Sequence, residues 1–441
     1  MDTAGHISLN LNVRGLGQSA TLLINERCRE LRAQGRAVCN MGLGQSPFPV
    51  PDPVVEALRV AAPSKDYLPV MGLPALREAV AAFHSKHDLL DARPENVIIG
   101  PGSKELMFLV QLVFYGEIMV KTPCWVSYLP QAQIIGRTVS KIDTRFESGW
   151  KITAEQLLRK LESSGDALRP RMLVLNYPAN PSGQTYSAEE LQELAEVARQ
   201  FETIVLSDEI YGPLNYEGRH VSIARFYPEG TIVSSGLSKW CGAGGWRLGT
   251  FLFPDELSWL QEAVAAVASE TYTSVSAPIQ YAAVRAFQGG VEIERYLWHA
   301  RRVLEALSRR CCDMLVDAGI RVHAPRGAFY LFLDFSRFRE ALARRRIHDG
   351  PTLAETVLEE TGTAFLPGSV FVRPVSELTA RLALVDFDGA QALAASENIP
   401  LHESLPEDFV EQYCPRVLEG VRRIAEWIAR LDEPESPADG S

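Results

Sequence analysis

Between Val97 and Phe253 the sequence alternates short β-branched runs with amphipathic stretches. This alternation is typical of parallel strands joined by helices, and it predicts an α/β fold with a doubly wound sheet. The expected strands are Val97–Ile99, Ile118–Lys121, Met172–Asn176, Ile204–Ser207, Ile232–Ser235 and Gly249–Phe253. In such sheets ligands bind where strands end, so polar residues that follow these strands are the first candidates for a functional site.

Two helices are well marked, and they suggest how the chain is divided. Ser187 and Glu190 form an S-x-x-E capping box, and small or apolar residues then recur on one face: Leu191, Leu194, Ala195 and Ala198. A long helix is expected over 292–318, with shorter strands and helices beyond it. We therefore expect an N-terminal segment (1–60), a large domain (61–300) and a smaller C-terminal domain (301–441). Residues 386–406 are polar and contain proline, which predicts a surface insertion.

Charge and cysteine content exclude several classes of protein. A net charge of -11 disfavours a nucleic acid or an anionic membrane as partner. The first residues do not combine a charged region with an apolar core, so we expect no signal peptide and a cytoplasmic location. The seven cysteines form no C-x-x-C pair, which favours reduced thiols, and no metal site is predicted.

A lysine among small residues follows the strand at 232–235. Lys239 lies in the stretch SSGLSKWCGAGGWRLG of residues 234–249, where few side chains obstruct a ligand. Such a lysine is a candidate for Schiff-base formation, because burial and nearby cations lower the pKa of an amine. Arg247 follows in the same loop and can offer its guanidinium to a phosphate. Alternatively, both residues belong to a solvated glycine loop, and this stretch alone does not decide between the two interpretations.

Three polar residues follow two other expected strands. Asp208 follows the strand Ile204–Ser207, where its carboxylate can pair with a protonated pyridine nitrogen, and the Tyr211 phenol can reach a ring oxygen. Asn180 lies in the turn NYPANPSG of residues 176–183, and its amide can donate to the same oxygen. Taken singly, a helix-capping aspartate, a packed tyrosine and an Asn-Pro turn are the more common interpretations.

Two weaker signals lie earlier in the chain. The loop Gly100-Pro-Gly-Ser-Lys104 joins a strand to a helix, whose first amides and the Ser103 hydroxyl can cradle a phosphate. Trp125 can stack on a planar heteroaromatic ring, although buried tryptophans usually serve packing alone.

Taken in order, these motifs resemble the class I/II aminotransferases of the aspartate aminotransferase superfamily, which are pyridoxal-phosphate enzymes of fold type I. The resemblance covers roughly residues 37–385. It rests on Gly44, Tyr67, Gly102-Ser103, Trp125, Asn180-Pro-x-Gly, Ser207-Asp208-Glu-x-Tyr211, Ser238-Lys239, Arg247, Gly327-Ala-Phe-Tyr330, Pro367-Gly-Ser369 and Arg381. It implies a three-layer α/β/α large domain with a mostly parallel sheet, a smaller α+β domain and a homodimer with shared active sites.

The resemblance also implies a role for each residue. Lys239 is the expected Schiff-base lysine and proton carrier, and Asp208 the partner of the pyridine nitrogen. The remaining cofactor contacts are expected from Gly102, Ser103, Lys104, Trp125, Asn180, Tyr211, Ser238, Arg247 and, across the dimer, Tyr67. Arg381, the Gly44 backbone and Asn180 are expected to hold the substrate's α-carboxylate. The implied reaction moves an α-amino group from an L-amino acid to a 2-oxo acid by ping-pong kinetics.

Two positions depart from the family pattern. Gly236 occupies the place of a hydroxyl residue three positions before the Schiff-base lysine, and Ser103 stands where some aspartate-selective relatives have lysine. The sequence leaves the donor and acceptor open. An elimination, a cyclisation or an oxidation on the same scaffold stays an alternative reaction.

Overall fold

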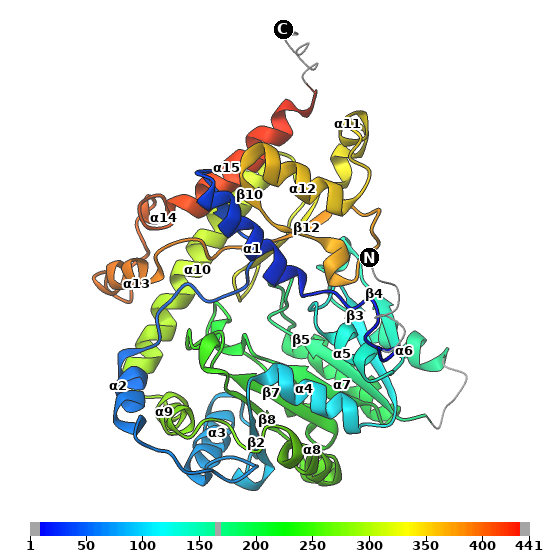
Figure 1. Ribbon diagram of the computed structural model, residues 1–441, viewed down its shortest axis with the longest axis vertical. Coiled ribbons are helices and arrows are strands. Elements are labelled where there is room, and N and C mark those ends of the chain that lie inside the picture. Colours follow the sequence, from blue (N-terminus) through cyan, green and yellow to red (C-terminus); the bar gives the residue numbers. More distant parts are fainter. Residues whose placement is uncertain (1–8, 164–168, 433–441) are drawn as a thin grey trace.

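The computed structural model describes residues 9–163 and 169–432. A large unit surrounds one extended sheet, and a smaller unit lies above it in Figure 1. The helix α10 (Val291–Asp317) runs between the two units and matches the helix predicted over 292–318. The predicted boundary at residue 300 falls inside this helix, which therefore continues from one unit into the other. The division into three segments stays a prediction.

The large sheet has seven strands in the order β2-β8-β7-β6-β5-β3-β4. All six predicted strands are present, and β4 was not predicted. Among the described strands of this sheet, β8 alone runs in the direction opposite to the other six, so the sheet is mostly parallel as expected. The strands are β2 (Val97–Gly100), β3 (Glu117–Thr122), β4 (Val139–Asp143), β5 (Arg171–Asn176), β6 (Ile204–Asp208), β7 (Thr231–Gly236) and β8 (Gly249–Leu252).

Helices cover both faces of this sheet because alternate strand residues are buried on opposite sides. Ile98 and Ile232 pack with helices on one face, whereas Ile99, Val205 and Val233 pack with helices on the other. The first set is α4 (Ser103–Val113), α5 (Tyr128–Ile134) and α8 (Ser258–Thr271). The second set is α3 (Pro74–His87), α6 (Ala154–Glu162), α7 (Ala188–Gln200) and α9 (Ala277–Gln288), with α2 (Asp52–Ala61) packed on α9. The expected three-layer α/β/α arrangement is confirmed.

The capping box predicted for α7 is present. The Ser187 hydroxyl accepts a hydrogen bond from the Glu190 amide at 3.2 Å, and the Glu190 carboxylate accepts one from the Ser187 amide at 2.8 Å. Both amides lie at the helix start, where they have no partner within the helix.

The smaller unit combines segments from both ends of the chain. Its three-stranded antiparallel sheet, in the order β11-β12-β9, consists of β9 (Tyr330–Asp334), β11 (Leu366–Pro367) and β12 (Thr379–Ala383). In addition, β1 (Cys39–Asn40) pairs in parallel with β10 (Thr363–Ala364). The helices are α1 (Ala20–Ala33), α11 (Arg339–Arg344), α12 (Gly350–Thr361), α13 (Gly389–Glu397), α14 (Phe409–Tyr413) and α15 (Pro415–Ala429). The predicted insertion 386–406 contains α13, which packs on α10 and buries Ala392 and Leu393, so it is more than a surface loop.

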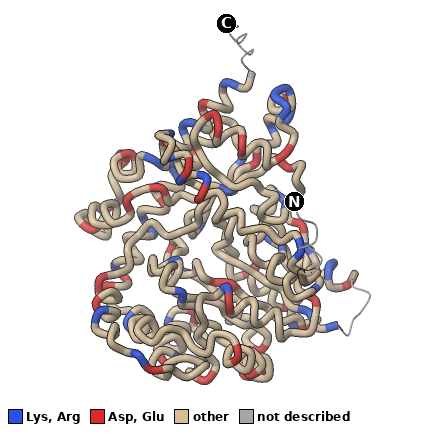
Figure 2. Tube along the Cα trace, viewed as in Figure 1, with Lys and Arg blue, Asp and Glu red and all other residues tan. Residues whose placement is uncertain are grey.

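Charged residues and cysteines are spread over both units. Basic and acidic positions are interspersed along the trace (Figure 2). All seven cysteines lie in the described ranges, where they are buried and unpaired. None of the described helices has both the length and the apolar character that crossing a membrane requires. The cellular location stays a prediction.

Candidate active site

A cavity of about 520 Å³ opens where the large sheet meets the smaller unit. Asp208 ends β6, Asn180 follows β5, and Lys239 follows β7, so three adjacent parallel strands carry these side chains to the same edge. The smaller unit closes the other side. The residues that line the cavity include Ser19, Leu22, Gly44, Ser103, Lys104, Trp125, Asn176, Asn180, Asp208, Tyr211, Ser238, Lys239, Arg247, Tyr330 and Arg381.

The amine of Lys239 points into this cavity. Its Nζ donates a hydrogen bond to the Gly44 carbonyl at 2.6 Å and lies 5.6 Å from the centre of the Tyr211 ring. Burial and the nearby Arg381 cation lower the pKa of Lys239 to about 8. A larger fraction of this amine is therefore unprotonated near neutral pH than in a solvated lysine, so more of it is available as a nucleophile and proton acceptor.

Asp208 is buried beside a tyrosine to which the sequence analysis assigned no role. Tyr128 donates a hydrogen bond to Oδ2 of Asp208 at 2.6 Å, whereas Oδ1 has no partner among the described residues. Burial raises the pKa of Asp208 to about 6, and the hydrogen bond from Tyr128 opposes that rise. An unpartnered buried carboxylate oxygen is costly unless a ligand satisfies it, so Asp208 is poised to receive a cationic or N–H donor.

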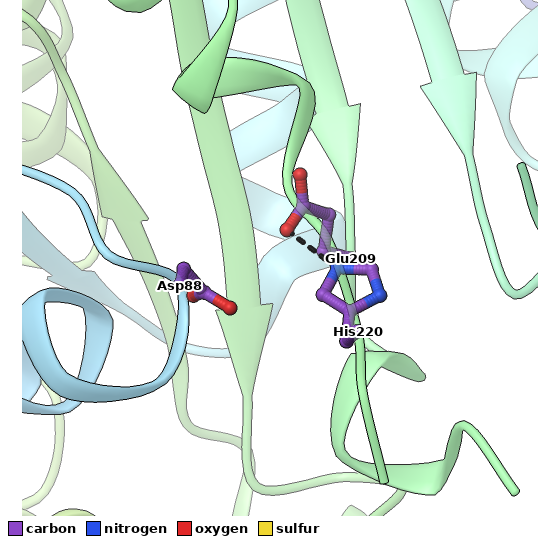
Figure 3. Close-up of side chains that lie close together, drawn as sticks. All are labelled: Asp88, Glu209 and His220. Atoms are coloured by element: carbon purple, nitrogen blue, oxygen red, sulfur yellow. Dashed lines mark hydrogen bonds and ion pairs between the residues drawn. The ribbon is translucent and has the colours of Figure 1, made fainter. Parts of the chain in front are cut away.

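Glu209, the residue after Asp208, is the centre of a second polar network (Figure 3). Glu209 accepts a hydrogen bond from His220 Nε2 at 2.8 Å. A carboxylate oxygen of Asp88 lies within 4.8 Å of a Glu209 carboxylate oxygen and of a His220 ring nitrogen. Burial disfavours the charged form of His220, but Glu209 outweighs it and the pKa of His220 is raised. Ser207, Ser222 and Tyr177 also donate to Glu209 at 2.6, 2.7 and 3.0 Å. Glu209 is thus fully hydrogen-bonded and anchors the chain directly after Asp208.

A cradle for an anion lies on the opposite side of the cavity. Gly102 has φ +91°, and a Cβ at this position would collide with the Arg247 guanidinium. A Cβ on Gly249 would likewise collide with the Ser103 amide. The two glycines therefore allow Arg247 and the N-terminus of α4 to approach one another, and both favour a phosphate there. Gly236 itself offers no hydroxyl to a phosphate. Ser238 lines the active-site cavity, whereas Ser235 lines a separate cavity, so Ser238 is the better placed of these two serines to supply one.

Trp125 and Lys104 border this cradle. The Lys104 amine lies 5.2 Å from the centre of the Trp125 ring. Burial and the Arg247 cation lower the pKa of Lys104. Within the described residues no acidic group pairs with this amine.

Arg381 is a fully buried cation in the smaller unit. It donates to Oδ1 of Asn180 at 3.1 Å and to the Gly42 carbonyl at 2.5 Å. Its Nε has no partner among the described residues, and its guanidinium lies 4.7 Å from the Tyr330 ring centre. The Tyr330 phenol is 2.7 Å from that of Tyr211. A buried guanidinium without a carboxylate partner is suited to bind an anionic substrate group.

These groups together fit pyridoxal 5'-phosphate. Its phosphate matches the cradle at Gly102 and Arg247, its ring nitrogen matches the unpartnered oxygen of Asp208, and its aldehyde matches the amine of Lys239. The flat face of Trp125 suits a heteroaromatic ring.

Sequence reasoning located most of this cavity and missed part of it. Tyr67 does not line it, and its side chain is 90% exposed, so within one protomer it makes no contribution. Tyr128, Asn176 and the start of α1 were not assigned roles. Tyr128 stands three residues after Trp125, a helical spacing that could have drawn attention to it. Nothing in the sequence marks α1 as a wall of the site.

Comparisons with known proteins agree with this geometry. The sequence model of the family described as aminotransferase class I and II matches residues 36–383. An aspartate aminotransferase of Geobacillus stearothermophilus is 33% identical over 378 residues, which cover 83% of this chain and 93% of that protein. An aspartate/prephenate aminotransferase of Thermus thermophilus is 32% identical, covering 82% and 91%. The solved structure of Thermus thermophilus aspartate aminotransferase with maleate matches with a TM-score of 0.79 at 29% identity, covering 95% of this chain and 99% of that one.

Proposed function

The chain belongs to the class I and II aminotransferase family, and we propose that Lys239 is its catalytic base and that its donor is a dicarboxylic amino acid. The observation that carries the first part is the convergence of three groups on one cavity: the Lys239 amine, the unpartnered Asp208 carboxylate and the Arg381 guanidinium.

Enzymes of this family use pyridoxal 5'-phosphate, which supplies an aldehyde that condenses with amines and a ring that withdraws electrons. The proposed roles of the protein residues follow from their positions. Asp208 holds the ring nitrogen in its protonated form, and the α4 N-terminus with Arg247 holds the phosphate. Arg381 and Asn180 grip the substrate α-carboxylate, which orients the Cα–H bond. Nζ of Lys239, with its lowered pKa, takes the Cα proton and returns it to a neighbouring carbon.

The purified protein tests this assignment directly. With a panel of amino acids, the visible spectrum of the cofactor-loaded protein should change only with true donors, and a 2-oxo acid should reverse the change. Lys239→Ala should abolish the conversion, whereas Lys86→Ala, an exposed lysine on α3 outside the cavity, should leave it intact. Release of ammonia without consumption of a 2-oxo acid would instead favour the elimination alternative.

The dicarboxylic donor is supported by two observations. The two relatives reported above are named for aspartate or for aspartate and prephenate, and Lys104 is a cavity cation without an acidic partner among the described residues. We propose that Lys104 receives the second carboxylate, in place of the lysine that some relatives carry at position 103.

Lys104→Gln separates this role from the cofactor contact expected from the sequence. If Lys104 binds the distal carboxylate, kcat/KM for aspartate falls by about a hundredfold, the range expected when a charged contact is lost, while uncharged donors and cofactor affinity change little. If Lys104 binds the cofactor, cofactor affinity falls and all donors are affected alike.

A homodimer with shared active sites is proposed as well. It is supported by the exposed Tyr67, which the family resemblance assigns to the partner's phosphate site. Sedimentation should give a dimer, and Tyr67→Phe should weaken cofactor binding. Mixing Tyr67→Phe with Lys239→Ala should then form hybrid dimers in which one site has both Tyr67 and Lys239 intact. A monomer with full activity would contradict the proposal.

A further inference from the structure

The chain between Ala37 and Gly44 supplies two backbone carbonyls to the active site. The Gly42 carbonyl accepts a hydrogen bond from Arg381, and the Gly44 carbonyl accepts one from Lys239. A displacement of this segment at Gly42 would therefore move the acceptor of the Arg381 guanidinium. Its attachment to the rest of the protein consequently bears on catalysis.

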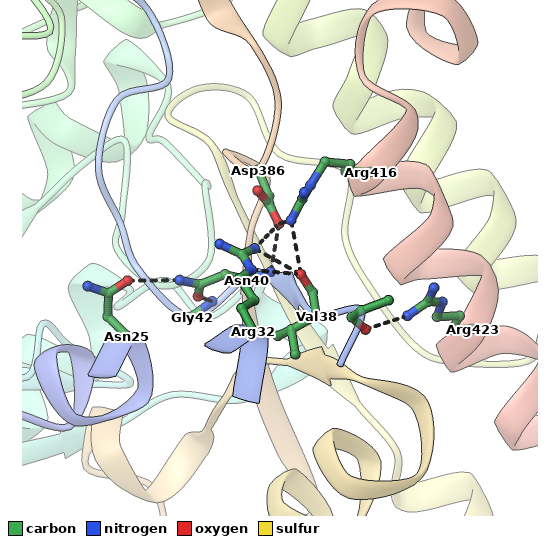
Figure 4. A network of polar contacts seen from close by, with 9 residues as sticks. Asn25, Arg32, Val38, Asn40, Gly42, Asp386, Arg416 and Arg423 are labelled. Carbon is green, nitrogen blue, oxygen red and sulfur yellow. Dashed lines mark hydrogen bonds and ion pairs between the residues drawn. The ribbon is translucent and has the colours of Figure 1, made fainter. Parts of the chain in front are cut away.

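One carboxylate oxygen fastens this segment, as Figure 4 shows. Oδ2 of Asp386 accepts three hydrogen bonds: from the Asn40 amide at 2.7 Å, from Arg32 at 3.0 Å and from Arg416 at 3.0 Å. The two arginines also donate to the Val38 carbonyl, at 2.8 and 3.0 Å. The side chain of Asp386 is only 17% exposed, so these charge-assisted contacts are partly shielded from water.

The Asn40 side chain extends the network in two directions. Its Nδ2 donates to Oδ1 of Asn25 on α1 at 2.9 Å, and its Oδ1 accepts from the Gly42 amide at 3.3 Å. An unbroken series of hydrogen bonds thus leads from Asp386 through Asn40 and Gly42 to Arg381. The same series ties down α1, the helix whose start lines the cavity.

We propose that Asp386 is a positioning residue for the substrate α-carboxylate, acting through Asn40 and Gly42 on Arg381. The inference rests on the proposed carboxylate role of Arg381. Asp386 lies five residues beyond Arg381, past the end of β12, so it can fix β1 relative to the strand that carries the guanidinium. An amide at position 386 would keep one acceptor for the Asn40 amide, but it would leave Arg32 and Arg416 without their shared anion.

Asp386→Asn in the cofactor-loaded enzyme is the test. We expect KM for the amino acid and KM for the 2-oxo acid each to rise about tenfold, with kcat within about twofold, because the loss concerns a group that both substrates share. The slow single-turnover reaction with ethylamine, which has no carboxylate, should keep its wild-type rate. A general loosening of the fold would slow both reactions.

Control variants keep the outcomes apart. Asp388→Asn removes the same charge two residues later, where Asp388 caps α13 by accepting a hydrogen bond from the Gln391 amide, and it should leave both KM values unchanged. If Asp386→Asn does not fold, Arg416→Lys is the substitute, and it should raise both KM values by less than tenfold.

Arg381→Lys distinguishes the inference from the function on which it rests. If this variant leaves both KM values unchanged, the proposed carboxylate site itself is wrong. If it raises them while Asp386→Asn does not, or if Asp386→Asn also slows the ethylamine reaction, the positioning role of Asp386 is overturned alone.

Discussion

Replacing Tyr128 by phenylalanine removes one oxygen from the buried neighbourhood of Asp208. The phenol donates its 2.6 Å hydrogen bond to Oδ2, and burial raises the pKa of Tyr128 well above its usual value, so the donor keeps its proton. In the variant both Asp208 oxygens lack a side-chain donor, apart from whatever the cofactor provides. The charged form of Asp208 loses stabilisation, and its pKa must rise.

The size of this rise can be worked out from the contact. A hydrogen bond to a charged group contributes about 1.5–3 kcal/mol, and one pKa unit corresponds to about 1.4 kcal/mol. The pKa of Asp208 in the cofactor-free protein, about 6, should therefore move to about 7–8 in Tyr128→Phe. Because the ionised carboxylate is the form that pairs with a protonated ring nitrogen, cofactor affinity falls as pH drops through this value.

The assay is the dissociation constant of pyridoxal 5'-phosphate between pH 5 and pH 9. The acid limb for Tyr128→Phe should lie about 1–2 pH units above that of the wild type. Tyr186→Phe is the matched control, since it removes another buried phenol, one that accepts a hydrogen bond from the Ile152 amide instead of donating to Asp208. Superimposable pH profiles for wild type and Tyr128→Phe would refute the reasoning.

Three further predictions follow from the same site. Burial raises the pKa of Asp208 from 3.8 to about 6, so the folded state holds this proton more tightly and the wild-type protein loses stability as pH rises through that window. In the cofactor-free protein, the free energy of unfolding of Asp208→Asn minus that of wild type, measured with urea, should therefore increase by up to about 3 kcal/mol between pH 4 and pH 8. Gly102→Ala should weaken cofactor binding at least tenfold, because the residue adopts φ +91° and its methyl group would displace Arg247; unchanged affinity by fluorescence titration would contradict the cradle. Arg381→Met should raise the pKa of Lys239 above about 8, which the pH dependence of cofactor uptake by the cofactor-free protein would report as a midpoint shifted towards alkaline pH.

The sheet could be predicted because its strands are buried on both faces and read as continuous apolar runs. Met172–Asn176 and Ile204–Ser207 are such runs. Asn176 at the end of the first run lines the cavity, and so does Asp208 directly after the second. The strand β4 was missed because its central residues, Ser140 and Lys141, are polar and incompletely buried at the sheet edge.

The site was predicted less completely, for a related reason. Lys239 and Asp208 follow strands, so their position is encoded locally. The contacts of Tyr128 with Asp208 and of Asp386 with Arg32 join residues 80 and 354 positions apart, and no local pattern specifies such pairs. The antiparallel direction of β8 was likewise not evident, since an apolar strand reads the same in either direction.

The pairing of β1 with β10 also has a consequence for biosynthesis. Cys39 finds its partner Thr363 only after a further 324 residues have been translated, which takes roughly 15–65 s at typical ribosomal rates. For nearly all of that interval Cys28 and Leu31 of α1 lack the cover that Leu358 and Ala364 later provide. Newly made polypeptide should therefore engage chaperones through its first forty residues, long after its central sheet has become resistant to proteases.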